Sequence, residues 1–195
     1  LLKAWKNKEK DWDQRIEKFS ETMIEQIDAL AFIANEFSDF AKLTNVTNDA
    51  LEMNEFIKSV IMLYKDFEHM NINFVSDNNE NQIYIMADRK QMLRVFNNLI
   101  RNSIQAIREN IIDITISLAK ENDNVIITIE DNGIGIKDEF KTKMFMPNFT
   151  TKTSGMGMGL AMVKSIIESN DGTISFETKW GEGTKFYIRL AVINK

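Results

Sequence analysis

Residues 113–131 constrain the fold of this chain most strongly, because they contain two alternating apolar runs joined by a short polar connection. In the sequence DITISLAKENDNVIITIED, apolar side chains recur at every second position, which is the period of a half-buried strand. A connection this short predicts an antiparallel hairpin, since parallel strands need a crossover of a dozen residues or more. The apolar positions that face each other are Ile114, Ile116 and Leu118 in one run and Ile127 and Ile129 in the other. A doubly wound parallel sheet therefore fits this chain poorly.

The remaining patterns add helices and further strands around this hairpin. Helices are predicted at residues 53–67, 88–109 and directly after Gly159, and strands at residues 72–77 and 82–88, with a closing hairpin at residues 173–192. The strongest of these helices, 88–109, has an apolar stripe at Leu93, Phe96, Ile100, Ile104 and Ile107. Adjacent hairpins with helices between them predict an α+β fold, a two-layer α/β sandwich in which helices cover a mixed sheet.

The first part of the chain has a different pattern. Residues 11–43 contain no glycine or proline, and their apolar residues recur every three or four positions. The stripe is broad, which favours a long bundle-forming helix over a two-stranded coil. We therefore predict two domains, residues 1–45 as part of a helical hairpin and residues 46–195 as the α+β domain. Because a wide apolar stripe needs a partner surface, we expect a homodimer through residues 11–43.

Composition excludes several classes of function. The net charge is −5 and no run of lysine or arginine resembles a nucleic-acid footprint, so nucleic acid is not an expected partner. No apolar run approaches the roughly 20 residues of a membrane span. The chain has no cysteine, which excludes disulfides and thiolate chemistry. Because it begins with Leu1 rather than methionine, we expect a piece of a longer protein, attached to a membrane only through a missing N-terminal region.

Two asparagines form the first cluster with chemical potential. Asn98 and Asn102 lie one helical turn apart in the predicted helix, so their side chains project side by side. Helix interiors disfavour asparagine, and an amide oxygen is a suitable ligand for a Mg²⁺ ion held mainly by phosphates. The pair therefore indicates a ligand site. The alternative is an ordinary solvated polar face.

A second cluster lies at the end of the predicted hairpin. Asp131 ends a strand and is followed at once by Gly133 and Gly135. A carboxylate in this place can accept a hydrogen bond from an exocyclic amine such as that of adenine, while the glycines admit the flat ring. The alternative is a simple turn, since Asp-Asn-Gly is also a common turn sequence.

A third cluster contains three of the chain's eight glycines. Gly155, Gly157 and Gly159 alternate with other residues and lead into an apolar, helix-forming run. Clustered glycine indicates backbone with positive φ or a close approach. A helix that begins directly afterwards favours an anion such as phosphate, because its free N–H groups and its dipole attract negative charge. A flexible loop with a glycine hinge is the alternative.

A long irregular segment precedes these glycines. Segments of this kind are usually lids or binding loops. This one carries Phe145, Phe149, Thr151 and Lys152. In a lid, Lys152 would meet a phosphate; in the alternative it is one more solvated lysine.

In this order and spacing, the clusters resemble the ATP-binding domain of the sensor histidine kinases, within the Bergerat-fold ATPases that also include gyrase, the Hsp90 chaperones and the MutL repair proteins. The resemblance covers most of residues 46–195. It implies the Bergerat ATP-binding fold, with ATP and Mg²⁺ as cofactors. Residues 1–45 resemble the second helix of the dimerisation and phosphotransfer hairpin, most closely that of the nitrogen-regulation-type sensor kinases.

The resemblance also implies a role for each cluster. Asn98 and Asn102 would form the asparagine box, with Asn102 reaching Mg²⁺ through the phosphates, and Asp131 would bind the adenine amine. The other residues implied in ATP binding are Gly133 and Gly135 of the first glycine box, Phe145, Phe149, Thr151 and Lys152 of the lid, Gly155, Gly157, Gly159 and Leu160 of the second glycine box, and Thr184 of the last glycine box.

The family's acceptor histidine lies on the first helix of the hairpin, in a motif like His-Glu-Ile-x-Asn-Pro, and this motif is absent here. The one histidine of the chain, His69, is followed by Met70 and is interpreted as structural. We therefore expect the acceptor to lie upstream of Leu1, and the present sequence to be unable to phosphorylate itself.

The predicted function is that of a protein histidine kinase, which passes the γ-phosphoryl group of ATP to a histidine and then to an aspartate in the receiver domain of a response regulator. One alternative is an ATP-hydrolysing clamp of the gyrase or chaperone type, and another is a non-catalytic nucleotide-binding dimerisation module. Clamp relatives carry a glutamate as general base where this chain has Asn98, and an amide cannot take that proton. The kinase is therefore favoured, with a cytoplasmic location as the cytoplasmic part of a membrane-anchored sensor.

Overall fold

The computed structural model describes residues 15–24, 27, 46–67, 69–77, 82–106, 111–151 and 157–193. The chain separates into two units, Leu1–Lys42 and Leu43–Lys195. Within the first unit residues 15–24 are helical, and exposed apolar side chains on them include Ile16, Phe19 and Met23. Most of the predicted bundle helix lies outside the described residues. The hairpin, the dimer contact and the domain boundary after residue 45 remain predictions.

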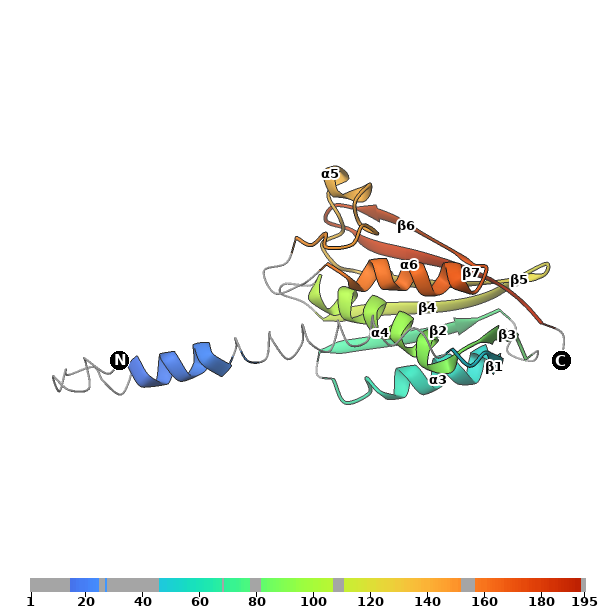
Figure 1. Ribbon diagram of the computed structural model, residues 1–195, viewed down its shortest axis with the longest axis horizontal. Helices are drawn as coiled ribbons and strands as arrows, with labels where there is room; N and C mark the ends of the chain where they lie inside the picture. The colour runs from blue at the N-terminus through green and yellow to red at the C-terminus, as the bar shows by residue number, and fades with distance from the viewer. Residues whose placement is uncertain are drawn as a thin grey trace. The chain divides into compact units, whose positions relative to one another are not determined.

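A five-stranded mixed sheet forms one layer of the second unit (Figure 1). The strands follow the order β2–β4–β5–β7–β6, in which β2 is parallel to β4 and all other neighbours are antiparallel. Their bounds are β2 Met70–Ser76, β4 Ile112–Glu121, β5 Asn124–Asp131, β6 Thr173–Lys179 and β7 Gly183–Ala191. Both predicted hairpins are present, as β4–β5 and β6–β7.

The two strands predicted at residues 72–77 and 82–88 do not pair with each other. The second of them, β3 (Tyr84–Ala87), pairs antiparallel with β1 (Asp49–Glu52), a strand that the sequence analysis missed. Its sequence, Asp-Ala-Leu-Glu, has no apolar alternation, whereas the equally short β3 is apolar throughout. The first of them, β2, lies parallel to β4, and the chain crosses between them through β3 and the helix α4 (Arg89–Gln105).

Helices form the second layer of the unit. In Figure 1, α4 and α6 (Gly159–Ser169) lie beside each other over the sheet, and α3 (Met53–Met62) lies near β1 and β2. The short helix α5 (Asp138–Lys141) belongs to the irregular segment before α6. Alternate side chains of β4, β5 and β7 are buried toward the helices and the intervening ones are more exposed. The predicted two-layer α+β sandwich is therefore confirmed.

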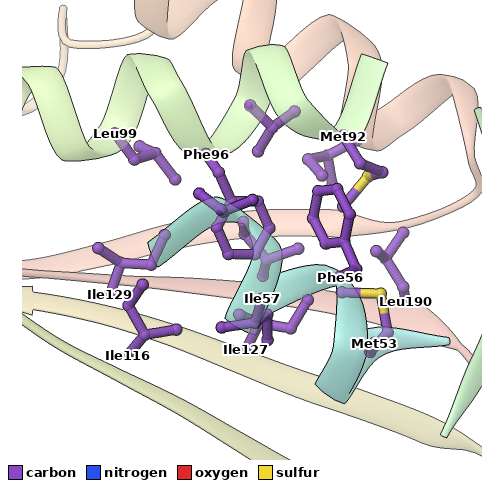
Figure 2. Close-up of a cluster of buried hydrophobic side chains, with 14 of the residues drawn as sticks. Met53, Phe56, Ile57, Met92, Phe96, Leu99, Ile116, Ile127, Ile129 and Leu190 are labelled. Carbon is purple, nitrogen blue, oxygen red and sulfur yellow. The ribbon is translucent and has the colours of Figure 1, made fainter. Parts of the chain in front are cut away.

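The core lies between these two layers. Figure 2 shows apolar side chains of α3 and α4 that meet those of the strands, including Ile116, Ile127 and Leu190. The rings of Phe56 and Phe96 contact edge to face, with 5.3 Å between their centroids. Each large side chain fully buried here contributes about 1.5–3 kcal/mol to the hydrophobic term. The core thereby fixes α4, the helix that carries both asparagines.

The buried face of α4 is wider than the predicted stripe. Phe96 and Ile100 are fully buried as predicted, Leu93 and Ile104 are only partly buried, and Ile107 lies outside the described residues. The other buried positions of this helix are Gln91, Met92, Val95, Leu99 and Ser103. The stripe is wider because α4 packs against both the sheet and α6.

Candidate functional site

Asp131 lies at the end of β5, where α4 and β7 both reach its carboxylate. The residue is only 5% exposed. Its Oδ1 accepts the backbone N–H of Gly133 at 2.9 Å and that of Thr184 at 3.2 Å. Its Oδ2 accepts the hydroxyl of Ser103, from α4, at 3.0 Å. The two oxygens are therefore unequal, and Oδ2 retains more capacity to accept a further donor.

Burial is the largest influence on the pKa of Asp131 and raises it above the usual aspartate range. The hydrogen bonds from Gly133, Ser103 and Thr184 act in the opposite direction, and the nearby charge of Glu130 raises the pKa slightly further. Burial prevails, so the carboxylate is less easily ionised than one in water. A buried acid with a raised pKa and converging donors is typical of a binding site.

The glycines after Asp131 allow its loop to pack closely. A Cβ on Gly133 would lie 2.7 Å from Oδ1 of Asp131 and 2.7 Å from Cβ of Ala106. Gly135 has a φ of +68°, and a Cβ there would collide with the carbonyl oxygen of Lys179. Side chains at these positions would push the loop away from α4 and from the β6–β7 turn.

A threonine pair supports the same loop from the sheet. The hydroxyl of Thr178 donates to the carbonyl of Gly183 at 2.8 Å and accepts the N–H of Ile136 at 2.9 Å. It also lies 3.0 Å from the hydroxyl of Thr184, the residue that pairs with Asp131 across β5 and β7. A hydroxyl has one proton, so Thr184 is the donor in this last contact. The predicted residue Thr184 thus contacts Asp131 through its backbone and the loop through Thr178.

The asparagines lie beside the beginning of α6. The Nδ2 of Asn98 donates to the carbonyl of Arg94 at 2.9 Å, which leaves its Oδ1 directed elsewhere. A Cβ on Gly159 would lie 2.5 Å from that Oδ1, so the amide oxygen faces the first residue of α6. Asn102 is partly buried one turn further along α4. The structure therefore brings Asn98 and Gly159, the last glycine of the cluster, together.

The N-terminus of α6 is not capped by the side chain of its own N-cap residue. Its N-cap residue is Met158, which makes no capping hydrogen bond through its side chain. The first N–H groups of a helix need acceptors, and an anion can supply them. Leu160 is buried in the core, so it has only its backbone to offer a ligand.

The two lid phenylalanines have different surroundings. The ring of Phe145 packs on Phe176 of β6 with 5.7 Å between centroids, whereas that of Phe149 packs on Phe140 of α5 at the same separation. Gly157 has a φ of +67°, and a Cβ there would collide with the backbone of Phe149. Thr151 is exposed. Lys152 and Gly155 lie outside the described residues, and their roles remain predictions.

A metal ion at this site would need a bound nucleotide, whose phosphates supply most of the oxygen ligands. The described residues contain no group of three or more histidine, cysteine, aspartate or glutamate side chains able to hold one. The amide oxygens of Asn98 and Asn102 are hard donors that suit Mg²⁺ when phosphates supply the other ligands. The residues present therefore fit a phosphate-bound Mg²⁺ rather than a metal held by the protein alone.

His69 has neither a helical nor a buried setting. It lies in an exposed turn before β2 with a φ of 61°. Its carbonyl accepts the N–H of Ile112 at 2.9 Å, next to the first pair of the β2–β4 ladder. This position is consistent with the structural role predicted for it.

Two residues that the predicted site did not include, Ser103 and Thr178, belong to it, together with Gly183 of the predicted last glycine box. Ser103, Thr178 and Gly183 contact Asp131 or its partners, and Gly183 has a φ of +110° beside the carbonyl of Asp131. Ser103 carried a usable signal, because it is a polar residue on the buried stripe of α4. Thr178 carried none, since a threonine in a strand is ordinary.

Residues 87–193, more than half of the chain, match the family described as histidine kinase-, DNA gyrase B- and HSP90-like ATPases. The chain belongs to this family. The predicted ATP-binding domain is thereby confirmed at the level of the family.

Similar curated proteins are sensor kinases. The sensor histidine kinase ZraS of Salmonella typhi is 34% identical over 180 residues, which cover 90% of this chain and 38% of ZraS. Sporulation kinase B of Bacillus subtilis is 28% identical over 172 residues, which cover 88% of this chain and 40% of that kinase. The chain thus spans about two-fifths of the length of these relatives. These similarities favour the kinase over the clamp ATPase. The closer resemblance to nitrogen-regulation-type sensor kinases remains a prediction.

Solved structures agree with the fold. The nucleotide-free catalytic domain of histidine kinase ThkA matches with a TM-score of 0.65 and 30% identity, over 74% of this chain and 95% of that domain. ThkA in complex with the response regulator protein TrrA matches with a TM-score of 0.74 and 26% identity, over 91% of this chain and 52% of that chain. Within the described residues, no helix is both long and apolar enough to cross a membrane.

Proposed function

We propose that this chain is the ATP-binding kinase portion of a two-component sensor histidine kinase. In the whole protein it would pass the γ-phosphoryl group of ATP to a histidine, and from there to an aspartate of a response regulator. The bond between the γ-phosphorus and its bridging oxygen breaks and a bond to an imidazole nitrogen forms, leaving ADP.

The observation that carries this proposal is the buried carboxylate of Asp131. Three donors fix it, and Oδ2 keeps room to accept the exocyclic amine of adenine. The contact between Asn98 and Gly159 supports a phosphate end of the same site, next to the N-terminus of α6, where the side chain of the N-cap residue Met158 makes no hydrogen bond. Asn102 would supply an amide oxygen to Mg²⁺, which neutralises phosphate charge when bound.

The chemistry of Asn98 favours transfer to a histidine over hydrolysis. Its amide donates to the carbonyl of Arg94 and cannot take a proton from water. Phosphoryl transfer needs mainly positioning and charge neutralisation, so a site without a base of its own suffices when the acceptor is an imidazole. We infer that His69 is not the acceptor, because it occupies an exposed turn with positive φ and lacks the helical setting of the family motif.

The partners follow from the same proposal. A response-regulator receiver domain is the expected phosphoryl acceptor, supported by the structure of the similar kinase ThkA in complex with TrrA. The exposed apolar side chains of residues 15–24 support a homodimer through residues 11–43. The site lies on the cytoplasmic side, where ATP is available.

Radiolabelling with γ-labelled ATP tests the proposed function. Residues 1–195 should bind ATP with Mg²⁺ and remain unlabelled, and adding a separate phosphotransfer hairpin that carries the acceptor histidine should yield acid-labile label on that hairpin. Brisk ATP hydrolysis without labelling would instead favour the clamp ATPase. Label on the chain itself that His69→Gln abolishes would show that the acceptor was misplaced.

Titration calorimetry with and without Mg²⁺ tests the metal assignment. Asn102→Ala should lose most of the Mg²⁺ dependence of nucleotide binding. A matched control is Asn97→Ala on the same helix, where the amide oxygen accepts the hydroxyl of Tyr64 at 2.9 Å. Equal Mg²⁺ dependence in Asn102→Ala and the wild type would move the metal site elsewhere.

A further inference from the structure

Ser103 is a buried polar residue that none of the predicted roles includes. It is 1% exposed and lies on the core-facing side of α4, directly after Asn102. Its neighbours on that face of the helix are apolar, among them Leu99 and Ile100. A hydroxyl in such a place lowers stability unless it is hydrogen-bonded, so its partners decide what it does.

The hydroxyl of Ser103 has one proton and two acceptors within reach. Oδ2 of Asp131 lies 3.0 Å away and the carbonyl of Leu99 lies 3.2 Å away. A serine inside a helix commonly bonds to the carbonyl four residues earlier. The carboxylate is the closer acceptor and the charged one, so it takes the proton whenever Asp131 is ionised.

We propose that the hydroxyl of Ser103 is a specificity-determining group of the nucleotide site, which keeps Asp131 an acceptor toward the ligand and so selects a 6-amino purine over a 6-oxo purine. Adenine presents a donor at this position, whereas hypoxanthine and guanine present an oxygen. An acceptor carboxylate attracts the first and repels the second.

The unequal bonding of the two carboxylate oxygens explains why Ser103 has this effect. Oδ1 is engaged by two backbone donors, so a proton on Asp131 would reside on Oδ2. With Ser103 present, that proton points at the serine oxygen, whose own proton turns to the carbonyl of Leu99. In both cases the shared proton lies between Ser103 and Oδ2 of Asp131 and does not face the ligand.

Without this hydroxyl, the proton on Oδ2 has only the ligand to face. Burial raises the pKa of Asp131, so a protonated carboxyl is reached at a higher pH than for a solvated aspartate. Within the described part of the chain, the charge that shifts the pKa of Asp131 is that of Glu130. Glu130 acts on it through space and is itself paired with Nζ of Lys185 at 3.1 Å, while α4 and β7 present the uncharged Ser103 and Thr184.

Binding of ADP and inosine diphosphate tests this role, because the two ligands differ only at the 6-position of the purine and the adjacent ring nitrogen. The role rests on the proposed nucleotide site, so the wild-type chain is measured first. It should prefer ADP on the order of a hundredfold. Failure to bind either ligand would contradict the proposed function itself.

The decisive variant is Ser103→Ala. The preference for ADP should fall by up to about tenfold once Asp131 is protonated, because the charge-assisted acceptor for the 6-amino group is then lost. The fall should grow as the pH is lowered, because the protonated carboxyl then donates to the 6-oxo group. A purely structural role would change the affinity for both ligands equally and leave their ratio independent of pH.

Ser103→Cys separates the hydrogen bond from the volume of the side chain. A thiol fills the same space but is a weak donor, so this variant should behave like Ser103→Ala. If it keeps the wild-type ratio while Ser103→Ala loses it, the volume and not the hydroxyl sets specificity, and the role is refuted. An unchanged ratio in both variants refutes it as well. Ser103→Cys alone decides the matter if Ser103→Ala fails to fold.

A matched control is Ser169→Ala. This serine also lies on a helix and bonds to a carbonyl of its own helix, that of Ile166 at 2.8 Å, but it is on the exposed side of α6 near its end. Its removal should leave the ratio of the two affinities at the wild-type value at every pH. A change in the control equal to that in Ser103→Ala would show that the ratio does not report on Asp131, and would refute the role.

Discussion

Asp88 and Asp131 are two aspartates with similar bonding and opposite properties. Asp88 is 7% exposed and Asp131 is 5% exposed. Each carboxylate accepts three hydrogen bonds from the protein, with two donors on one oxygen and one on the other. The net pKa of Asp88 is nevertheless lowered, whereas that of Asp131 is raised.

The difference lies in depth and in the nature of the donors. Burial raises the pKa of Asp88 too, but the backbone N–H groups of Thr47, Gln91 and Lys90 outweigh it. Asp88 caps the N-terminus of α4, close to solvent and in the favourable field of the helix dipole. Asp131 lies deeper, and one of its donors is a hydroxyl that can turn away. A small exposed area therefore does not by itself tell a structural carboxylate from one that serves a binding site.

The largest effect should come from removing the charge of Asp131. Asp131→Asn replaces the acceptor Oδ2 with an amide that can present a donor to the adenine amine. Nucleotide affinity should fall by about tenfold to a hundredfold, the equivalent of ~1.5–3 kcal/mol for a charge-assisted hydrogen bond. Titration calorimetry with a non-hydrolysable ATP analogue measures this. Equal affinities in the variant and the wild type would contradict the assignment of Asp131 as the acceptor for the adenine amine.

Asp88→Ala should affect the fold and not the site. Loss of an N-cap typically costs about 1–2 kcal/mol, and here the contact to Thr47 at 2.9 Å is lost as well. The free energy of unfolding, measured by urea denaturation, should fall by this amount while nucleotide affinity stays near the wild-type value. A large loss of affinity in the folded variant would mean that the two regions are coupled.

Thr178→Val should have a smaller effect, on the Asp131 side only. Valine keeps the shape of threonine but removes the hydroxyl that joins Gly183, Ile136 and Thr184. We expect nucleotide affinity to fall about twofold to tenfold, since three neutral hydrogen bonds are lost that support the loop and none of them is to the ligand. Thr173→Val, at an exposed position of the same strand, is the matched control and should bind normally. Loss of affinity in both variants would point to a general effect on β6.

The smallest effects should appear in the pH dependence of stability, and with opposite signs. The stabilising contribution of Asp88 is present above the unfolded pKa of about 3.9 and is lost as pH falls through its lowered folded pKa. For Asp131, the native state holds a proton longer than the unfolded chain does, so stability decreases as pH rises from about 4 through its raised pKa.

Urea denaturation at a series of pH values separates the two cases. Relative to wild type, Asp131→Asn should gain stability as pH rises from about 4 through the raised pKa of Asp131. Asp88→Asn should lose stability in the lower window, as pH rises through the lowered folded pKa of Asp88 to about 3.9. Parallel curves for both variants would show that depth does not distinguish the two carboxylates.

The sequence allowed much of this to be predicted, and particular residues show where it did not. The β4–β5 hairpin was visible because its alternation runs through two strands of ten and eight residues. The strand β1 was not predicted, because its sequence has no apolar alternation. As a result, the pairing of β3 with β1 was not expected either. At the site, Asp131 was found from its position before two glycines, while Ser103 and Thr178 were not found.

The sequence by itself determined which groups are available, namely a carboxylate at a strand end, two amides one helical turn apart and glycines where the backbone must come close. These are local features, fixed by spacing along one element. Only the tertiary structure decided that Ser103 and Thr184 meet Asp131, and that Gly159 meets Asn98. Such contacts join residues from different elements, and the packing of α4 and α6 on the sheet brings them together. The depth that raises the pKa of Asp131 has the same origin, because burial is a property of the assembled layers and of no single segment.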